Sequence, residues 1–461
     1  MPDGYWTSAI FLTYLAPKLR PMGRVLAALL LTLSLGVATA QAQPQEPAAS
    51  LSSTAERIYA ETRPKLLQIR TLVAAAGRQS SIGSGFLVSA DGLAITNYHV
   101  VSQYALEPKT YRLEYASADG KSGDLKLLAI DLANDLAIVR TDRRDQPYLQ
   151  FDPRGVSGEL PNGERLYSMG NPLDLGFTIV EGTYNGLVER SYTDRIHFSG
   201  AVNPGMSGGP TVTVDGRIAG INVSKQIGGE LVSFLVPAGH AATLLKRVEA
   251  DQEPPPDDFR AEIGRQLSAW QARLYKSINE MGFRPATFGP YQAAESGAPW
   301  FTCWAQTNAG QLPKPRAAIN STNCNSDTRL FVANDFSTGL IHLDHSYVQS
   351  VDLNQFQFSA FLSGKSQAIW PGGWAQKWQT QPRCQEGFVA AKPESEHPPL
   401  RVVWCARAYR QFEGLYDISV LMVTQDSGTR ALVSRLGLQA VSYDNAIALS
   451  RRFLEAVRWT K

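Results

Sequence analysis

A single serine lies among glycines in residues 203–210, which read NPGMSGGP. A serine hydroxyl becomes a nucleophile only when a base lies beside it and hydrogen-bond donors face the oxyanion that forms. The glycines leave the backbone N–H groups of Gly205 and Ser207 uncovered by bulky side chains, as an oxyanion hole requires. In isolation this motif is more often a glycine turn between strands. A catalytic interpretation therefore needs a base and an orienting acid elsewhere in the chain.

Two stretches upstream of Ser207 supply such residues. Residues 83–101 (GSGFLVSADGLAITNYHVV) predict a β-hairpin that ends in His99, and residues 131–139 (DLANDLAIV) place Asp135 at the start of an apolar strand. Each has a plain structural alternative, since His99 is acceptable as a hydrogen-bonded strand-end histidine and Asp135 as a turn residue. The chain has only six histidines, however, and this one precedes an aspartate and a glycine-flanked serine within one β-rich segment. The order of the three residues favours a catalytic triad.

One rival interpretation fails on chain order. The pentapeptide around Ser207 also fits GxSxG, the nucleophile elbow of α/β-hydrolases, which needs the acid and the histidine after the serine and a helix directly behind it. Here both partners come before the serine, and Pro210 leads into the strand-like sequence TVTV. The elbow interpretation is therefore rejected.

The chain resembles the chymotrypsin-fold serine proteases, most closely the bacterial HtrA (DegP-like) branch. The similarity covers roughly residues 60–245 and is carried by six ordered blocks, at residues 96–101 (TNYHVV), 134–139 (NDLAIV), 169–172 (MGNP), 203–210 (NPGMSGGP), 219–222 (AGIN) and 234–237 (FLVP). The resemblance implies a double six-stranded β-barrel with the triad in the cleft between the barrels. It also implies roles: Ser207 as nucleophile, His99 as general base and acid, Asp135 as its orienting partner, and the N–H groups of Gly205 and Ser207 as the oxyanion hole.

Two departures from the wider family limit what the resemblance implies. Digestive-type relatives have disulfides in the protease and an aspartate just before the serine, whereas this chain has Met206 there and no cysteine before Cys303. Activation by N-terminal cleavage is therefore not expected. The HtrA branch usually has PDZ domains after the protease, and we recognise no PDZ pattern in residues 258–461. Peptide-gated activation and large oligomeric cages are not carried over.

The specificity pocket is predicted from position relative to Ser207. Ala201 lies near the expected pocket base, and Ile221, Asn222 and Val223 lie near its walls. An uncharged base disfavours Lys or Arg at P1, the residue whose carbonyl is attacked. We therefore expect cleavage after small or medium apolar residues.

Length and composition set the wider organisation. A chain of 461 residues is too long for one typical domain. Residues 1–42 predict a signal peptide, with Lys18, Arg20 and Arg24 before an apolar run and an Ala-x-Ala-like cleavage site, so that the protein is expected to be exported to the periplasm or secreted. Beyond residue 42 the basic and acidic residues are equal in number, which argues against nucleic acid as a partner. No later stretch is long and apolar enough to cross a bilayer.

Composition divides the remaining chain. Residues 43–53 predict a linker, 54–248 an all-β protease domain, and 249–257 an acidic, proline-rich linker. Residues 258–461 predict a separate α+β domain of unknown function, because helical apolar stripes flank its strand-like runs. Trp370, Trp374 and Trp378 are weak candidates there for ligand stacking, and His342, Asp344 and His345 are weak candidates for metal binding.

All four cysteines of the chain lie in the last third, where Cys303 and Cys324 are separated by the same 21 residues as Cys384 and Cys405. An even number in an exported chain predicts two disulfides. Four cysteines allow three connectivities, of which we favour the local one, Cys303–Cys324 with Cys384–Cys405. A zinc site is the alternative, although no CxxC pair exists.

The sequence thus predicts an exported serine endopeptidase that acts on protein or peptide substrates with no cofactor or metal, and whose C-terminal domain targets it or binds substrate. The alternative is a binding or scaffold protein that keeps the protease fold and hydrolyses weakly or only with an activator. None of these patterns sets the oligomeric state.

Overall fold

The structure is a computed structural model that describes residues 52–225, 231–250, 255–256, 258–367, 370, 375–391 and 396–460. The predicted signal peptide (1–42) and nearly all of the predicted linker 43–53 lie outside the described residues, as does most of the linker 249–257. The domain limits 54–248 and 258–461 stay predictions. No helix among the described residues is long and apolar enough to span a membrane.

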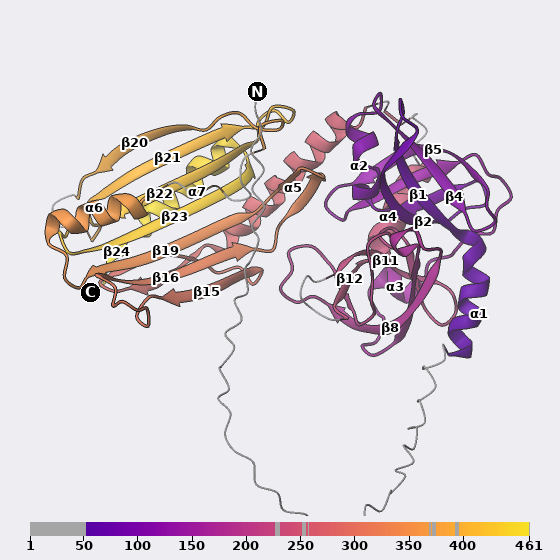
Figure 1. The fold of residues 1–461 in the computed structure, drawn as a ribbon, viewed down its shortest axis with the longest axis horizontal. Helices are drawn as coiled ribbons and strands as arrows, with labels where there is room; N and C mark the ends of the chain where they lie inside the picture. Colours follow the sequence, from indigo (N-terminus) through magenta and orange to yellow (C-terminus); the bar gives the residue numbers. More distant parts are fainter. Residues whose placement is uncertain are drawn as a thin grey trace, which may run out of the picture. The chain divides into compact units, whose positions relative to one another are not determined.

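The N-terminal part contains two closed six-stranded barrels, which confirms the predicted protease fold (Figure 1). The first is built from β1 (Leu66–Val73), β2 (Arg78–Leu87), β3 (Leu93–Thr96), β4 (Tyr111–Ser117), β5 (Ser122–Asp131) and β6 (Leu136–Thr141). The second is built from β7 (Arg165–Gly170), β8 (Thr178–Leu187), β9 (Ile196–Phe198), β10 (Pro210–Val212), β11 (Ile218–Lys225) and β12 (Ser233–Pro237).

The apolar strand sequences explain why the barrels pack together. Every residue of β3 is buried, as are the first four of β6. Phe86 and Ile138 of the first barrel share one buried cluster with Met169 and Ile221 of the second. Burying such side chains contributes about 1.5–3 kcal/mol each before the entropy cost of ordering them. The cluster therefore holds the barrels at the interface where the candidate catalytic loops meet.

Helices accompany the barrels, and one of them matters for the site. They are α1 (Ser53–Thr62), α2 (Tyr98–Leu106), α3 (Pro153–Ser157) and α4 (Ala238–Ala250), with 3₁₀ turns η1 (Arg63–Lys65) and η2 (Pro172–Asp174). The sequence pattern placed His99 at the end of a hairpin, whereas it lies in the first turn of α2. The sequence pattern did not predict this helix, because Val100 and Val101 are β-branched and apolar, which is typical of a strand. Both side chains are buried.

The C-terminal part is mostly β, which corrects the α+β prediction. Its centre is a seven-stranded antiparallel sheet in the order β15 (Phe301–Thr307), β16 (Ala317–Ser326), β19 (Ile341–Ser350), β23 (Arg430–Val441), β22 (Tyr416–Thr424), β21 (Leu400–Ala408) and β20 (Arg383–Val389). Smaller sheets are formed by β13 (Phe283–Phe288), β14 (Tyr291–Ser296) and β24 (Arg458–Trp459), and by β17 (Leu330–Ala333) and β18 (Phe336–Thr338). The polar strand β16 and the exposed strand β20 show little apolar alternation, so the sequence pattern predicted too few strands.

Three helices cover the large sheet: α5 (Arg260–Met281), α6 (Gln355–Lys365) and α7 (Tyr443–Glu455). Strand β22, next to the central strand β23, is buried on both faces. Val420 and Met422 belong to the cluster that includes α5 and α7, while Leu421 and Val423 pack with Phe358 of α6. The helical apolar stripes predicted to flank the strand-like runs thus correspond to α5 and α7, which bury one face against this sheet.

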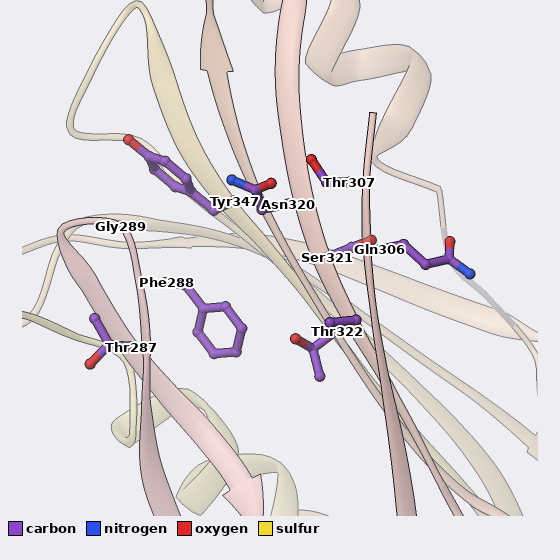
Figure 2. A pocket seen from close by; sticks show the side chains of 10 residues that line it. Thr287, Phe288, Gly289, Gln306, Thr307, Asn320, Ser321, Thr322 and Tyr347 are labelled. Atoms are coloured by element: carbon purple, nitrogen blue, oxygen red, sulfur yellow. The ribbon is translucent and has the colours of Figure 1, made fainter. Parts of the chain in front are cut away.

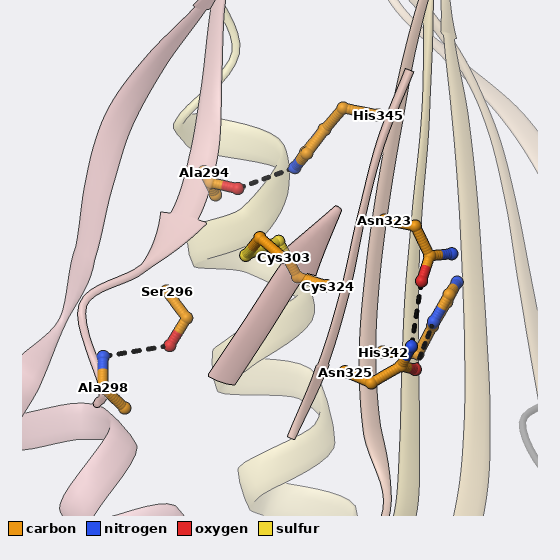
Figure 3. The surroundings of a disulfide bond; sticks show 9 residues. All are labelled: Ala294, Ser296, Ala298, Cys303, Asn323, Cys324, Asn325, His342 and His345. Carbon is orange, nitrogen blue, oxygen red and sulfur yellow. Dashed lines mark hydrogen bonds between the residues drawn. A yellow bond between two sulfur atoms is a disulfide. The ribbon is translucent and has the colours of Figure 1, made fainter. Parts of the chain in front are cut away.

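The two disulfides have the local pairing favoured from the sequence. Cys303 is bonded to Cys324 (Figure 3) and Cys384 to Cys405, each with a sequence separation of 21 residues. In both cases the cysteines are directly opposite residues on neighbouring antiparallel strands. Because β15 and β20 are the two edge strands of the sheet, each disulfide ties an exposed edge to its neighbour. The zinc alternative is contradicted, since these thiols are oxidised.

Candidate active site

The first turn of α2 places His99 against Asp135. The imidazole Nδ1 lies 2.6 Å from Asp135 Oδ2, and the backbone N–H of His99 donates to Oδ1 of the same carboxylate at 2.9 Å. Two contacts to one carboxylate fix both the ring orientation and the start of the helix. Because a carboxylate accepts hydrogen bonds, the proton on Nδ1 faces Asp135, and Nε2 is left as the basic atom. A general base needs this arrangement.

Asp135 itself is held by the turn that precedes β6. Its backbone is left-handed, with φ of 60°, a conformation that Asp and Asn tolerate better than other non-glycine residues. Its carbonyl oxygen accepts from the Asn97 side chain at 2.7 Å and from the Tyr98 N–H at 3.2 Å. The sequence NYH before α2 therefore positions the aspartate as well as the histidine.

The electrostatics of this pair favour a protonatable histidine. Burial acts to lower the pKa of His99, but the negative charge of Asp135 and its hydrogen bond outweigh it, and the pKa of His99 is raised above its ordinary value of 6.5. The imidazole is still reachable from solvent, because the side chain is 28% exposed. The raised pKa means that Asp135 stabilises the imidazolium, the form that His99 takes when it accepts a proton from a nucleophile.

Ser207 lies in a loop that packs directly against the histidine-bearing segment. The Ser84 N–H donates to Ser207 O at 2.7 Å. Gly208 has φ of +84°, and a Cβ there would meet Thr96 Oγ1 at 2.4 Å and Asn97 N at 2.9 Å. The Ser207 hydroxyl donates to Val223 O at 3.3 Å. It must rotate away from this carbonyl to give its proton to His99.

The proposed oxyanion donors are available. Among the hydrogen bonds of the described residues, neither Gly205 N–H nor Ser207 N–H donates to a protein acceptor. The preceding carbonyl, Pro204 O, accepts from Leu173 N at 3.0 Å, and because the peptide is planar and trans, Gly205 N–H points the opposite way. This hydrogen bond thus fixes the direction of the Pro204–Gly205 peptide and of its N–H group.

Ser84 is a positioning residue that the sequence analysis treated only as part of a hairpin. Its hydroxyl donates to Gly205 O at 2.7 Å and accepts from Asn171 N at 2.9 Å. It therefore joins β2 to both loops that shape the oxyanion hole. The signal was present in the GSGF sequence, where a small polar residue stands between two glycines of a buried strand.

The four predicted pocket residues are placed differently from one another. Ala201 is partly buried in the stretch before Ser207, and Val223 lines a cleft that also reaches Asp135. The Ile221 and Asn222 side chains are both fully buried. The Asn222 amide accepts from Ser168 and Thr211 and donates to the backbone. Any pocket wall that Ile221 and Asn222 provide is therefore their backbone.

The candidate stacking and metal-binding residues of the C-terminal part are largely engaged in burial, hydrogen bonds or ion pairs within the fold. Trp378 is buried, and Trp374 lies outside the described residues. His345 bonds to Ala294 O at 2.7 Å and to the Ser434 hydroxyl at 2.8 Å, and burial lowers its pKa to about 4 (Figure 3). Asp344 forms an ion pair with Arg435. These contacts leave His345 neutral and Asp344 engaged, so they do not favour the metal site.

A separate hollow of about 420 Å³ lies in the C-terminal part, away from the triad. It is lined by Phe288 and Tyr347 and by the polar side chains of Thr307, Asn320 and Thr322, and Asn320 lies beside Tyr347, its partner on the neighbouring strand (Figure 2). It contains no titratable side chain except the Tyr347 phenol, and thus no carboxylate, histidine or thiol for chemistry.

Comparisons with known proteins agree with this geometry. A family model described as a trypsin-like peptidase domain matches residues 83–221. The probable periplasmic serine endoprotease DegP-like of Marinomonas sp. is 30% identical over 210 residues, which cover 44% of this chain and 40% of the relative. A protein of the same description from Hahella chejuensis is 33% identical over 207 residues, covering 43% and 40%. The chain thus spans about two fifths of the length of these relatives.

Among solved structures, the serine endoprotease from Yersinia pestis is 22% identical, with a TM-score of 0.38, and the match covers 44% of this chain and 68% of that one. The similarity to peptidases rests instead on the matched domain, the curated relatives and the two closed barrels. Residues 83–221 are therefore similar to a trypsin-like peptidase domain, and the relatives from Marinomonas sp. and Hahella chejuensis are described as periplasmic serine endoproteases.

Proposed function

We propose that the protein is an exported serine endopeptidase that hydrolyses peptide bonds through His99, Asp135 and Ser207. The observation that carries the proposal is the double contact of Asp135 with the ring and the backbone of His99, beside a glycine-flanked serine. Export is supported by the signal-like residues 1–42 and by relatives whose names include "periplasmic".

The chemistry follows from the positions of the protons. Ser207 Oγ attacks the substrate carbonyl carbon while His99 Nε2 takes the hydroxyl proton, and the carbonyl oxygen becomes an oxyanion beside Gly205 N–H and Ser207 N–H. The imidazolium then gives its proton to the leaving amine, and an acyl enzyme remains. A water molecule then attacks the acyl carbon while His99 Nε2 takes a proton from it. The imidazolium returns that proton to Ser207 Oγ as the ester bond breaks and the carboxylic acid product leaves. Asp135 stays ionised throughout and stabilises the imidazolium.

The test is labelling by a small fluorophosphonate, which reacts with a serine only when its base and oxyanion hole are assembled. We expect the folded protein to be labelled at Ser207 and Ser207→Ala to lose the label completely. Ser199→Ala serves as the control, because the Ser199 hydroxyl bonds to Thr183 of β8 and, among the hydrogen bonds of the described residues, none joins it to His99, Asp135 or Ser207. A folded wild-type protein that takes up no label would contradict the proposal.

A second candidate, a protease-fold binding protein with weak or activator-dependent hydrolysis, is favoured by one contact. The Ser207 hydroxyl donates to Val223 O, so its proton is directed away from His99 at rest. Labelling that is negligible alone but appears on addition of protein substrate would support this candidate.

We further propose cleavage after small or medium apolar residues, because Ala201 gives the pocket base no charge. A P1 peptide library is expected to show Ala, Val or Leu preferred over Lys and Arg by at least tenfold. A preference for Lys or Arg at P1 would overturn this specificity.

A further inference from the structure

A hairpin from the C-terminal part lies on the catalytic histidine. It is formed by β17 and β18, and we refer to residues 330–338 as the 330–338 hairpin. The Phe331 ring meets the His99 ring edge-on, with centroids 5.9 Å apart and planes at 72°, and it meets Tyr98 at 6.2 Å. The buried Tyr98 hydroxyl donates to Val332 O at 2.8 Å. One turn of α2 therefore carries both the catalytic base and the attachment point of this hairpin.

The same hairpin lines a cleft that begins at the triad. The cleft has a volume of about 610 Å³ and is lined by Asp135 and Val223 from the barrels and by Leu330 and Phe331 from the hairpin. The Ser207 hydroxyl bonds to Val223 O, so one end of the cleft lies beside the nucleophile. Further apolar lining comes from Leu132, Val188 and Phe234. Two arginines and two aspartates also line the cleft, and their charges balance. We therefore expect apolar contacts to determine which substrate side chain the cleft prefers.

The hairpin is anchored as a fixed wall and not as a mobile lid. Val332 is fully buried, and Phe336 is 5% exposed. Phe336 stacks on Trp378 with centroids 5.3 Å apart, and Trp378 Nε1 donates to Asp335 at 3.0 Å in the turn of the hairpin. Thr338 hydrogen-bonds to the Tyr409 hydroxyl. Moving the hairpin would expose this apolar cluster and break these bonds.

Helix α5 of the C-terminal part contacts the segment that leads to Asp135, the partner of His99. Gln266 accepts from Leu132 N at 2.7 Å and donates to Ile130 O at 2.8 Å, on the loop that leads to Asp135. Arg260 donates to Leu106 O at the last turn of α2. The C-terminal part thus contacts both the histidine helix and the aspartate loop, as expected if it belongs to the active site.

The open edge of β11 indicates how a substrate would reach the cleft. Among the described strands, Ser224 and Lys225 pair with β12 alone, because β10 pairs only as far as Ile221, and Val223 lies at a bulge opposite β12. An extended peptide can add to such a free edge. Its alternate side chains point to opposite sides, so when P1 faces the pocket near Ala201, the preceding residue, P2, faces His99 and Phe331.

We propose that the 330–338 hairpin forms one wall of the substrate cleft and that Phe331 makes this subsite selective for an apolar P2 side chain. The inference deepens the proposed peptidase function and depends on it. It assigns the C-terminal part a role in substrate selection at the active site, in addition to any targeting role elsewhere.

The test uses peptidyl phosphonates that share Ala at P1 and carry Gly or Leu at P2, together with a small fluorophosphonate that has no P2 group. In the full-length protein we expect the leucine probe to inactivate faster than the glycine probe. Phe331→Ala is expected to lower the Leu:Gly rate ratio about tenfold, the scale of losing one apolar contact in a pocket. Labelling by the small probe is expected to change less than threefold.

The control is Phe388→Ala, because Phe388 lies on the edge strand β20 of the same part and is 73% exposed. This variant should keep the wild-type ratio. If Phe331→Ala does not fold, Phe331→Gln keeps the side-chain length but removes the apolar face, and the same fall is expected. An unchanged Leu:Gly ratio with normal small-probe labelling overturns the role of Phe331 alone. Failure of the wild type to react with any probe overturns the peptidase function and this inference with it.

Discussion

Asp135→Asn is expected to lower kcat about 10⁴-fold while leaving the fold intact. Asparagine tolerates the left-handed backbone of residue 135, where φ is 60°. Its oxygen can still accept from His99 N–H, as Asp135 Oδ1 does at 2.9 Å. The amide NH₂ group then faces His99 Nδ1, which must become an acceptor. The imidazole proton moves to Nε2, and the atom that should take the proton of Ser207 is blocked.

The pH profile of Asp135→Asn separates this mechanism from general damage. In the wild type the pKa of His99 is raised above 6.5, so kcat/KM should fall as the pH drops through a midpoint above that value. Without the carboxylate charge, burial is the remaining influence on the pKa of His99, and burial lowers it. The midpoint of the residual activity is therefore expected to shift below 6.5.

Asp145→Asn is the matched control. Asp145 also has a left-handed backbone, with φ of 54°, but it is exposed on the surface. Its kcat, its pH midpoint and its melting temperature should all match the wild type. If Asp135→Asn retained more than about a tenth of wild-type kcat, Asp135 would not be the orienting acid of the triad.

The order of residue types pointed to a candidate triad, because each proposed role needs a particular side chain and each candidate lay next to a glycine turn or an apolar strand. His99, Asp135 and Ser207 could be selected from local sequence alone. The α2 helix was missed, since its buried Val100 and Val101 mimic a strand. The disulfide pairing was predictable from equal spacing and proved to join cross-strand neighbours.

The contributions of Ser84 and Phe331 were not predictable from sequence, because both depend on contacts between distant segments. Ser84 reaches Gly205, 121 residues later, through a single hydroxyl. Phe331 reaches His99 from the C-terminal part, and no local pattern in its strand distinguishes it from a core aromatic residue. The α+β prediction failed for a related reason: exposed, polar edge strands such as β20 are recognised by their partners and not by their own apolar pattern.

Gly205→Ala is expected to lower kcat by about 10²–10³-fold with a much smaller change in KM, the loss typical of one oxyanion donor. Gly205 has φ of +94°, which an alanine adopts only with strain. An added Cβ would also meet Asn171 O at 2.4 Å and Leu173 N at 2.9 Å. The loop must therefore move away from residues 171–173, which breaks the Leu173 N to Pro204 O hydrogen bond and turns the Gly205 N–H from the oxyanion.

Gly216→Ala is the control that shows whether the fall in kcat of Gly205→Ala comes from the lost oxyanion donor or from backbone strain alone. Gly216 has φ of +70° in the turn before β11, and a Cβ there would meet no atom within 4 Å. Both variants place alanine at positive φ, so both should lose on the order of 1 kcal/mol of folding free energy from backbone strain. Only Gly205→Ala should lose kcat, because only there does the clash displace a donor that binds charge in the transition state. Equal kcat values in the two variants would show that Gly205 N–H does not stabilise the oxyanion.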